Sequence, residues 1–596
     1  MTTRADRGPR RRTVAALAVI LVVLAAFIVR LVDIQVVSAA EHVADSVNTG
    51  KLGVTQPIHG ARGDIVDATG TVMASTVLVY DAQLDPKLIQ DNEDEDDSAK
   101  KIAPPWSEVS DEIAHIIGKN GDDVRALVAD ALAENESSRY AQLARGLSTA
   151  QYLELKDLGL PYLAMPSRSV RVYPNGAVAG NTIGFLNGEG AAQYGVERMA
   201  DECLAPTNGE ESYLRGKGGV KIPGSERITP AVDGGTVQLT INSDLNWYLQ
   251  QMIAEEARRQ GAKAGTVTVV EAKTGKIRAA AEYPAVDPND INAVDPAYWK
   301  SHIFSDEFEP GSTFKAITAA TVIDQGAATP TSHVTAPSRE RFPNGAVIND
   351  PFGHPVYEYT LAGALIDSSN VSLSKFGTMV DPQTRVEYLK RFGVGEKTAV
   401  HFPGEADGGV RDAKTWDNQT LYTTTFGQAF TVTTAQLAGA YQALANDGTK
   451  IDLSLIESCT DVDGTVKKAP EPDSHQVIKP DTAAQVQRML ENVAVQGGLS
   501  KTIDVPGYRI GSKTGSAQKS NGHGGYKQGV YFTSIVGMAP IEDPQYVVVV
   551  TMDEPTKIRS SAATAVAFQK AMTQVLKTYR VAPSSQPMDE LLPKFD

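Results

Sequence analysis

The chain has 596 residues, of which 42% are hydrophobic and 21% are charged, a composition typical of globular proteins. This length exceeds a single ordinary core, so we expect more than one domain. Fifty-six basic against 72 acidic residues give a net charge of −16, which argues against a nucleic-acid partner because a phosphate backbone needs a basic surface.

The N-terminus carries a cluster of arginines (residues 4–12) followed by an uncharged apolar run over residues 13–29. The run has the length of a short membrane span, which flanking arginines can extend. We expect a cytoplasmic tail (1–12) and an anchor (13–33), with the rest of the chain outside the cytoplasm. The alternative is a cleaved signal peptide ending near Val37-Ser38-Ala39, but Arg30 and Asp33 suit a retained anchor better.

The next region reads as a mixed domain. Turn residues break 54–85 into strands, and within them Arg62-Gly63-Asp64 is read as structural rather than as an adhesion motif. The acidic run 90–101 predicts a solvated, mobile loop. Helical periodicity follows in 107–157, and 165–230 is rich in glycine. We expect an elongated α+β domain over 40–230.

A second domain is predicted from residue 231 to 580. A strand near 236 leads into an amphipathic helix that ends before Gly261, and 264–283 reads as two strands around a Lys-Thr-Gly-Lys turn. The tail 581–596 looks loose. Cys203 and Cys459 are the chain's two cysteines, and we expect two reduced thiols, with one bridge as the alternative.

The pattern Ser-x-x-Lys occurs at Ser98, Ser312, Ser372 and Ser516. Ser98 lies in the acidic loop, which would not hold a reactive pair. Ser312 follows Pro310-Gly311 and begins a predicted helix, on which Lys315 lies one turn away, near Ser312. Apolar neighbours would bury Lys315, lower its pKa and make it a base for the serine hydroxyl. The alternative is a capping serine with a surface lysine.

Two further motifs follow Ser312 and favour the reactive interpretation. Ser368-Ser369-Asn370 has the pattern Ser-x-Asn, and Lys513-Thr514-Gly515 lies in a strand-like segment. Ser-x-Asn also occurs at Ser46 and Lys-Thr-Gly at Lys273, but both precede Ser312. The ordered triple, with spacings of 56 and 145 residues, is typical of penicillin-binding proteins and serine β-lactamases.

Nearly the whole chain resembles the class B penicillin-binding proteins, which are peptidoglycan D,D-transpeptidases. The resemblance rests on the three motifs, on residues 426–448 and 531–540, and on the segments "RGDIVDATG" and "RVYPNGAVAGNTIGF". The resemblance implies an α+β fold: one transmembrane helix, a pedestal (dimerisation) domain, and a transpeptidase domain with an antiparallel sheet flanked by helices, like that of serine β-lactamases. This sequence departs from the usual family pattern at Ser516, where many relatives have threonine.

The resemblance also implies roles for the motif residues. Ser312 would attack the penultimate D-Ala carbonyl, Lys315 would take its proton, and Ser368 would relay a proton to the leaving D-Ala. Asn370 would bind the substrate backbone, and the strand residues Lys513, Thr514 and Gly515 would line the carboxylate site. Backbone N–H groups of Ser312 and Ser516 would form the oxyanion hole. No metal and no organic cofactor is implied.

The implied ligands are D-Ala-D-Ala stem peptides and β-lactam antibiotics. The implied partners are a SEDS-family glycan polymerase and divisome membrane proteins, because the division subfamily is favoured over an elongation role. A serine β-lactamase is disfavoured, because none of the six glutamates between Asn370 and Lys513 has asparagine four residues on. A D,D-carboxypeptidase stays open, and a β-lactam sensor would need a larger cytoplasmic segment.

Overall fold

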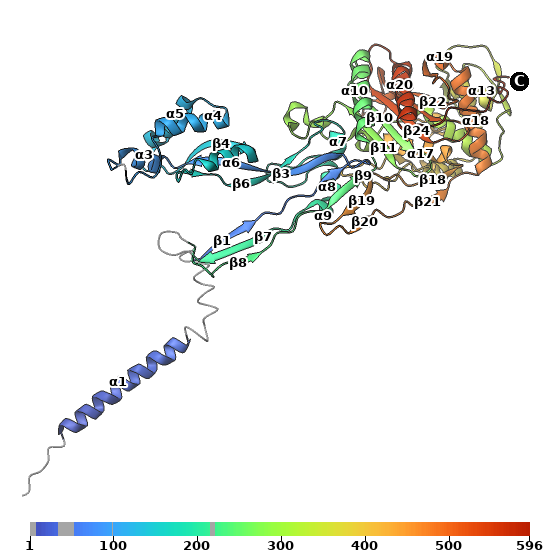
Figure 1. The fold of residues 1–596 in the computed structure, drawn as a ribbon. Coiled ribbons are helices and arrows are strands. Elements are labelled where there is room, and N and C mark those ends of the chain that lie inside the picture. Colours follow the sequence, from blue (N-terminus) through green and yellow to red (C-terminus); the bar gives the residue numbers. More distant parts are fainter. Residues whose placement is uncertain (1–7, 34–52, 98, 215–220) are drawn as a thin grey trace, which may run out of the picture. The chain divides into compact units, whose positions relative to one another are not determined.

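The computed structural model of the chain describes residues 8–33, 53–97, 99–214 and 221–596. Residues 1–7 of the expected tail, the possible cleavage site at 37–39, Ser46 and Ser98 lie outside these ranges. The chain divides into two compact units, one made of residues 1–61 and 206–233 and the other of residues 62–205 and 234–596. Figure 1 shows the fold in sequence colours.

The first unit contains a long apolar helix and a small sheet. Helix α1 covers Gly8–Val32, and its segment Val14–Val32 has a mean hydropathy of 2.9 and has no buried residue. It is long and apolar enough to cross a membrane, and among the described residues no other helix is. Strands β1 (Gly53–Ile58), β7 (Gly209–Leu214) and β8 (Arg227–Thr229) pair antiparallel in the order β1-β7-β8.

An eight-stranded sheet in the second unit combines strands from both predicted domains. Its main path runs β20-β19-β9-β2-β3-β4, and β5 and β6 also pair with β3. The pairing of β2 with β9 is parallel. The strands are β2 (Ile65–Val66), β3 (Val72–Leu84), β4 (Ala141–Leu147), β5 (Leu163–Ala164), β6 (Ser167–Val172), β9 (Thr236–Leu239), β19 (Ile456–Thr460) and β20 (Val466–Lys468). The sheet therefore crosses the boundary expected near residue 230.

A disulfide joins Cys203 to Cys459, so the expectation of two reduced thiols is wrong. Cys203 lies in α9 (Asp201–Leu204), and Cys459 lies in β19 opposite Val237 of β9. The backbone N–H of Gly235, just before β9, donates to the carbonyl of Cys203. Strand pairing thus brings together two cysteines that are 256 positions apart, which their sequence spacing could not indicate.

Four helices accompany the first half of this sheet: α3 (Pro86–Asp94), α4 (Trp106–Ile117), α5 (Gly121–Glu134) and α6 (Thr149–Asp157). The helical prediction for 107–157 is confirmed, although β4 interrupts it. The acidic run is not wholly a loop, because α3 extends to Asp94 and the buried side chain of Asn92 accepts hydrogen bonds from the backbone N–H groups of Ile102 and Ala103. Arg62 forms a buried ion pair with Glu197 at 2.7 Å, in keeping with a structural role for Arg62-Gly63-Asp64.

A five-stranded antiparallel sheet forms the centre of the C-terminal half, in the order β11-β10-β24-β23-β22. Its strands are β10 (Ala264–Glu271), β11 (Ile277–Tyr283), β22 (Gly511–Ser520), β23 (Tyr526–Ala539) and β24 (Tyr546–Asp553). Helices α10 (Ser243–Gln260) and α20 (Ala562–Thr578) lie on one face and α17 (Thr434–Ala445) on the other (Figure 1). The strand and helix predictions for 236–283 are confirmed.

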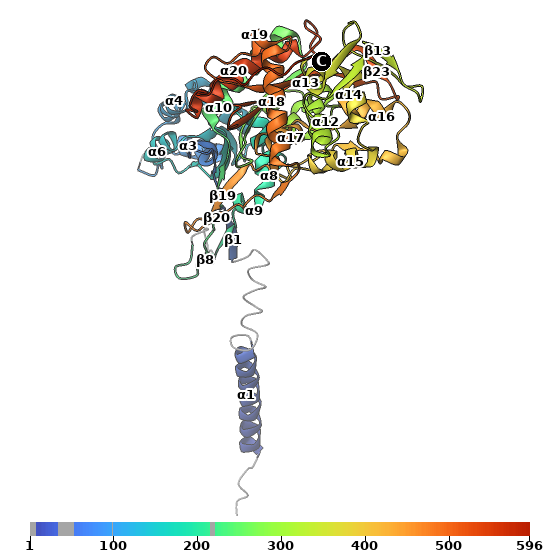
Figure 2. The same cartoon turned by 90° about the vertical axis from the view of Figure 1, so that its right-hand side faces the viewer.

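Further helices lie beyond the α17 face. They are α12 (Lys315–Asp324), α13 (Leu361–Ile366), α14 (Asn370–Gly377), α15 (Pro382–Arg391) and α18 (Pro480–Gln496), and Figure 2 shows them grouped with α17. They share one apolar core, whose buried members include Phe314, Leu373 and Leu437. The α+β architecture with an antiparallel sheet flanked by helices is confirmed.

The C-terminal tail is not loose. The carbonyl of Val581 accepts a hydrogen bond from the Tyr508 hydroxyl at 2.7 Å. Leu592 is 5% exposed, and the Thr360 hydroxyl donates to the carbonyl of Pro593 at 2.6 Å. The C-terminus lies beside α13 in both Figure 1 and Figure 2. Its proline and serine content predicted mobility, but backbone and side-chain partners elsewhere in the fold hold it.

Candidate active site

Ser312 lies in a tight turn at the entrance to a buried helix. The 3₁₀ turn η4 covers Gly311–Phe314, and α12 continues from Lys315. Gly311 has φ +57°, a conformation that favours glycine, and its N–H donates to the carbonyl of Gly427 at 2.8 Å. The sequence predicted an α-helix from Ser312, but the first turn is 3₁₀, in which residues i and i+3 lie one above the other.

Lys315 is completely buried, as its apolar neighbours predicted. Its ammonium group donates to the backbone carbonyl of Ser368 and to the Ser368 hydroxyl, the latter at 3.1 Å. Among the described residues no hydrogen bond joins Lys315 Nζ to the half-buried Ser312. In this arrangement Lys315 is therefore held by the second motif, one turn from Ser312.

Ser368 and Asn370 come from the junction of α13 and α14. Ser368 has φ +56°, which is rare for a residue with a side chain and typical of functional sites. Ser369 caps α14 by accepting a hydrogen bond from the N–H of Ser372 at 3.0 Å. The Asn370 amide donates to the carbonyl of Asn349 at 2.9 Å. The cap fixes the helix start, and the unusual backbone of Ser368 directs its side chain towards the lysines.

Strand β22 carries the third motif against η4. Lys513 is 1% exposed and its Nζ donates to the Ser368 hydroxyl at 3.1 Å and to the carbonyl of Thr514 at 3.2 Å. Gly515 lies so close to η4 that an added Cβ would be 3.0 Å from Thr313 Cγ2 and 3.1 Å from the carbonyl oxygen of Pro310, the residue before the turn. Ser516 is exposed, and its hydroxyl accepts a hydrogen bond from the N–H of Ser561 at 2.8 Å. The three motifs therefore meet at one place.

Burial lowers the pKa of both lysines and so favours their neutral form. Loss of solvent lowers the pKa of Lys513 to about 7. The pKa of Lys315 is held well below its usual range, first by burial and then by the charge of Lys513, while the carboxylate of Asp350 opposes the shift. Near neutral pH the site can therefore hold a neutral amine beside a hydroxyl, which is the requirement for general-base activation of a serine.

Comparison with known proteins agrees with this geometry. The family model "Penicillin binding protein transpeptidase domain" matches residues 265–573, and "Penicillin-binding Protein dimerisation domain" matches residues 57–239. Penicillin-binding protein PbpB of Mycobacterium tuberculosis is 33% identical over 92% of this chain and 81% of that protein. Peptidoglycan D,D-transpeptidase FtsI of Escherichia coli K12 is 28% identical over 89% of this chain and 86% of FtsI.

The chain is a class B penicillin-binding protein. The crystal structure of penicillin binding protein 3 from Mycobacterium tuberculosis complexed with ampicillin has the same fold, with a TM-score of 0.69 and 25% identity over 91% of this chain and 100% of that one. The family predicted from the three ordered motifs is thus confirmed.

In this penicillin-binding protein, the lysines of the Ser372 and Ser516 patterns have ordinary ion pairs. Lys375 pairs with Glu340 and Lys519 with Asp553, each at 2.7 Å. Lys315 differs because its ammonium group bonds to a serine carbonyl and hydroxyl and makes no ion pair within the described chain. This contrast separates Ser312 from Ser372 and Ser516.

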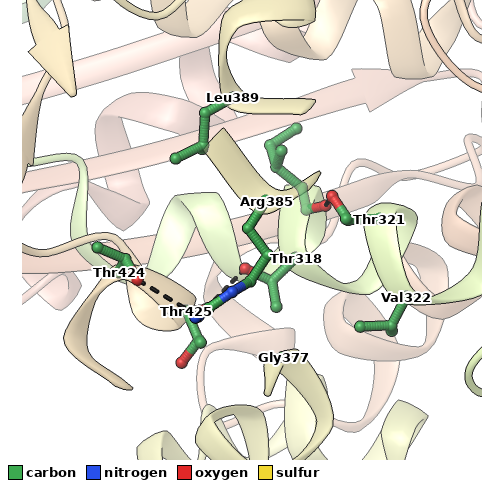
Figure 3. A pocket seen from close by; sticks show the side chains of 9 residues that line it. Thr318, Thr321, Val322, Gly377, Arg385, Leu389, Thr424 and Thr425 are labelled. Carbon is green, nitrogen blue, oxygen red and sulfur yellow. Dashed lines mark hydrogen bonds between the residues drawn. The ribbon is translucent and has the colours of Figure 1, made fainter. Parts of the chain in front are cut away.

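A cavity of about 20 Å³ lies behind α12, between α14, α15 and the 3₁₀ turn η6 (Thr424–Phe426) (Figure 3). It is lined by Thr318, Thr321, Gly377 and Arg385 among others, and Arg385 Nη1 donates to the carbonyl of Leu421 at 2.8 Å. No residue of the three motifs lines it, and its volume suits about one water. It is therefore a small, partly polar cavity behind the site and not the substrate cleft.

Sequence reasoning missed the groups that hold the second motif in place. Asp350, whose side chain is completely buried, accepts hydrogen bonds from the Ser369 hydroxyl at 2.7 Å and from the N–H of Val371 at 2.9 Å. His354 contacts the same carboxylate at 2.8 Å. These residues precede the motif in an ordinary polar loop and form no recognised pattern with it, so the sequence contained no signal for them.

Proposed function

We propose that the chain is a membrane-anchored peptidoglycan D,D-transpeptidase that cross-links stem peptides through an acyl-enzyme on Ser312. One observation carries the proposal: the Ser368 hydroxyl lies 3.1 Å from both Lys315 Nζ and Lys513 Nζ, two fully buried amines, and Lys315 follows Ser312 by one turn. Such a chain of amine, hydroxyl and amine can move a proton into and out of a serine acyl transfer.

In the proposed acylation, Ser312 Oγ attacks the carbonyl of the penultimate D-Ala. Neutral Lys315 takes the hydroxyl proton as the new C–O bond forms. The Ser368 hydroxyl then passes its proton to the leaving nitrogen and receives the proton held by Lys315 through their hydrogen bond, so Lys315 becomes neutral again as the C–N bond breaks and D-Ala leaves. Low pKa values support these roles, because Lys315 must be unprotonated at the start and must regain its neutral form after the transfer.

The oxyanion of the tetrahedral intermediate is proposed to bind the backbone N–H groups of Ser312 and Ser516. The close approach of β22 to η4 at Gly515 supports this role, because it brings the two backbones together. Removing one such donor typically costs about 3–4 kcal/mol of transition-state stabilisation. Thr514, Gly515 and Lys513 would bind the terminal carboxylate, and Asn370 the substrate backbone. The amine of a second stem peptide would then attack the ester and release Ser312. Every protein group in these steps is a side chain or backbone N–H of this chain, and the two stem peptides supply the rest.

We also infer that β-lactams inhibit the protein by acylating Ser312. They present a strained amide to the same nucleophile, and the neighbouring solved structure is described as complexed with ampicillin. Since a β-lactam keeps its leaving nitrogen tethered after ring opening, the acceptor amine would be excluded and the acyl-enzyme would persist.

We propose the following organisation in the cell: a cytoplasmic tail (1–12), a single-pass anchor (13–33), an extracytoplasmic pedestal (40–230), a transpeptidase domain (231–580) and a C-terminal tail (581–596). The apolar helix Val14–Val32 and the arginines before it support this orientation. The Cys203–Cys459 disulfide also supports it, because disulfides persist outside the reducing cytoplasm.

A role in septal cell-wall synthesis is proposed from the similarity to PbpB and FtsI over most of the chain. The partners would be a SEDS-family glycan polymerase, which supplies uncross-linked strands, and divisome membrane proteins. The pedestal and the membrane helix are the surfaces available for such contacts.

The test is a product analysis with the purified full-length chain in detergent. A stem pentapeptide ending in D-Ala-D-Ala is incubated with and without a second peptide that offers a free side-chain amine, and products are identified by mass spectrometry. We expect a cross-linked dimer and free D-Ala with the wild type and neither with Ser312→Ala. A shortened tetrapeptide without dimer would instead assign a D,D-carboxypeptidase.

A further inference from the structure

Asp350 is the centre of a buried polar cluster directly behind the second motif. Its Oδ2 accepts from the Ser369 hydroxyl at 2.7 Å and its Oδ1 from the N–H of Val371 at 2.9 Å. These donors flank Asn370 and follow Ser368, so the carboxylate fixes the start of α14. A buried carboxylate needs such donors, because water is not available to solvate it.

His354 completes the bonding of Asp350. Its side chain is 4% exposed, with Nε2 at 2.8 Å from Asp350 Oδ2 and Nδ1 at 2.6 Å from the carbonyl oxygen of Pro355. Both ring nitrogens therefore lie within hydrogen-bond distance of an oxygen. The result is a buried histidine–aspartate contact behind Ser368-Ser369-Asn370.

Aromatic rings hold His354 in turn. Tyr357 stacks on the imidazole with ring centroids 5.3 Å apart and planes 7° apart, and Tyr359 meets it edge-on at 5.5 Å. Phe595 packs on these two tyrosines, at 4.4 Å from Tyr357 and 5.0 Å from Tyr359. A side chain from the C-terminal tail thus contacts the rings that hold the histidine.

The C-terminal segment (residues 592–596) is itself fixed by an isolated antiparallel β-bridge between Phe595 and Tyr359. The N–H of Thr360 donates to the carbonyl of Lys594, and the N–H of Asp596 donates to the carbonyl of Glu358, both at 3.0 Å. A Cβ at Gly363 would lie 1.9 Å from the Lys594 oxygen, so α13 has a glycine where the C-terminal segment passes. The fold is therefore built to receive these residues.

The C-terminal segment also contacts the residue before the second motif, through Lys594 and Asp367. Lys594 Nζ lies 2.7 Å from Asp367 Oδ1, and the Tyr359 hydroxyl lies 3.3 Å from Asp367 Oδ2. Asp367 immediately precedes Ser368, whose φ of +56° is costly for a residue with a side chain. The C-terminal segment therefore contacts the motif's immediate neighbour through Lys594 and the motif's support through Phe595.

We propose that the C-terminal segment, acting through His354 and Asp350 and through Asp367, positions Ser368 between the two lysines. Its residues touch neither substrate nor reacting atoms in this arrangement, so they are positioning residues. The inference rests on the proposed function of Ser368 as the proton relay. Without the C-terminal segment, the backbone at Ser368 can relax towards ordinary angles, which moves the hydroxyl away from Lys315 and Lys513.

The experiment measures the kinetics of penicillin acylation in the full-length chain. Stopped-flow labelling with a fluorescent penicillin gives the first-order acylation constant, the apparent dissociation constant of the initial complex, and the fraction of protein labelled. The variants are Phe595→Ala, Lys594→Ala and His354→Gln, with Phe595→Tyr as the conservative rescue. The matched controls are Leu591→Ala and His475→Gln, whose side chains are exposed and lie outside these contacts.

We expect the first-order constant to fall about tenfold or more in Phe595→Ala and His354→Gln, because small misplacements of a catalytic group are costly. The dissociation constant and the labelled fraction should stay near the wild-type values, and Phe595→Tyr should restore the rate. Global unfolding would lower the labelled fraction instead. Wild-type first-order constants in Phe595→Ala, Lys594→Ala and His354→Gln would overturn the inference and leave the role of Ser312 intact. Labelling of Ser312→Ala would overturn the proposed function itself.

Discussion

Two lysines with low pKa values dominate the site at the scale of single residues. Lys315 and Lys513 are both fully buried, and neither forms an ion pair within the described chain. Burial alone lowers the pKa of Lys513 to about 7, so folding must either desolvate its charge or release its proton. The low pKa values that the proposed mechanism needs are therefore obtained at the expense of stability, as in many active sites.

Replacement of Lys513 by methionine, which has a similar length and no charge, should stabilise the fold. The pKa of Lys513 is about 7 in the folded state against an ordinary value of 10.5, so the unfolded chain binds more protons between about pH 7 and 10.5. The wild type thus gains stability as pH rises through this window. We expect Lys513→Met to raise the free energy of unfolding by about 1–4 kcal/mol at pH 7, with the difference vanishing towards pH 10.5, and to abolish acylation.

Lys519→Met is the matched control, measured by thermal unfolding at the same pH values. Ion pairs with Asp553 and Glu554 outweigh burial and raise the pKa of Lys519, so its charge stabilises the fold below pH 10.5. The control should therefore lower the melting temperature at pH 7. Destabilisation by Lys513→Met at pH 7 would show that its burial is not a cost.

At the scale of elements, the contact between β22 and η4 sets the distance between the backbones of Ser516 and Ser312. Gly515→Ala would place a Cβ 2.5 Å from Ser534 Oγ of β23 and 3.0 Å from Thr313 Cγ2 of η4, so β22 must shift relative to both neighbours, one of which is the turn that carries Ser312. We expect acylation to slow by about tenfold or more, because the backbone N–H groups of Ser312 and Ser516 separate. Labelling kinetics and thermal unfolding would check this.

Gly498→Ala serves as its control, since an added Cβ there meets nothing within 4 Å. It should leave both the acylation rate and the melting temperature near the wild-type values. Equal rates for Gly515→Ala and the wild type would mean that the close approach of β22 to η4 is not required.

The sequence predicted the elements whose signals are local. The periodicity of 243–260, the turn between β10 and β11, and the glycine after α10 lie within short windows and are confirmed. The 3₁₀ turn at Ser312 depends on Gly427, and the backbone of Ser368 depends on Asp350 and Asp367, all distant or unpatterned in sequence. The three motifs indicated which residues meet, but their supports arise from tertiary packing.

At the scale of the whole molecule, the disulfide ties helix α9 of the N-terminal half to a strand of the eight-stranded sheet that comes from the C-terminal half. It links α9 to β19 across 256 positions, beside the pairing of β19 with β9. Sequence spacing alone left a bridge as the less favoured alternative, because strand order in a sheet is not visible in the spacing of cysteines.

Removing the bridge with Cys203→Ser and Cys459→Ser together should lower the free energy of unfolding by about 2–4 kcal/mol. Denaturant unfolding of the oxidised wild type and the double variant would measure the loss. A thiol reagent should label the wild type only after denaturation with a reductant. Quantitative labelling of protein purified from the cell envelope, without reductant, would contradict both the bridge and the extracytoplasmic placement.

The proposed acyl-transfer mechanism depends on Ser312 being the nucleophile. Its most direct test is to incubate the full-length protein with benzylpenicillin, digest it and locate the adduct by tandem mass spectrometry. We predict one penicilloyl group on Ser312 in the wild type and none in Ser312→Ala. An adduct on any other residue, or undiminished modification of Ser312→Ala, would contradict the account.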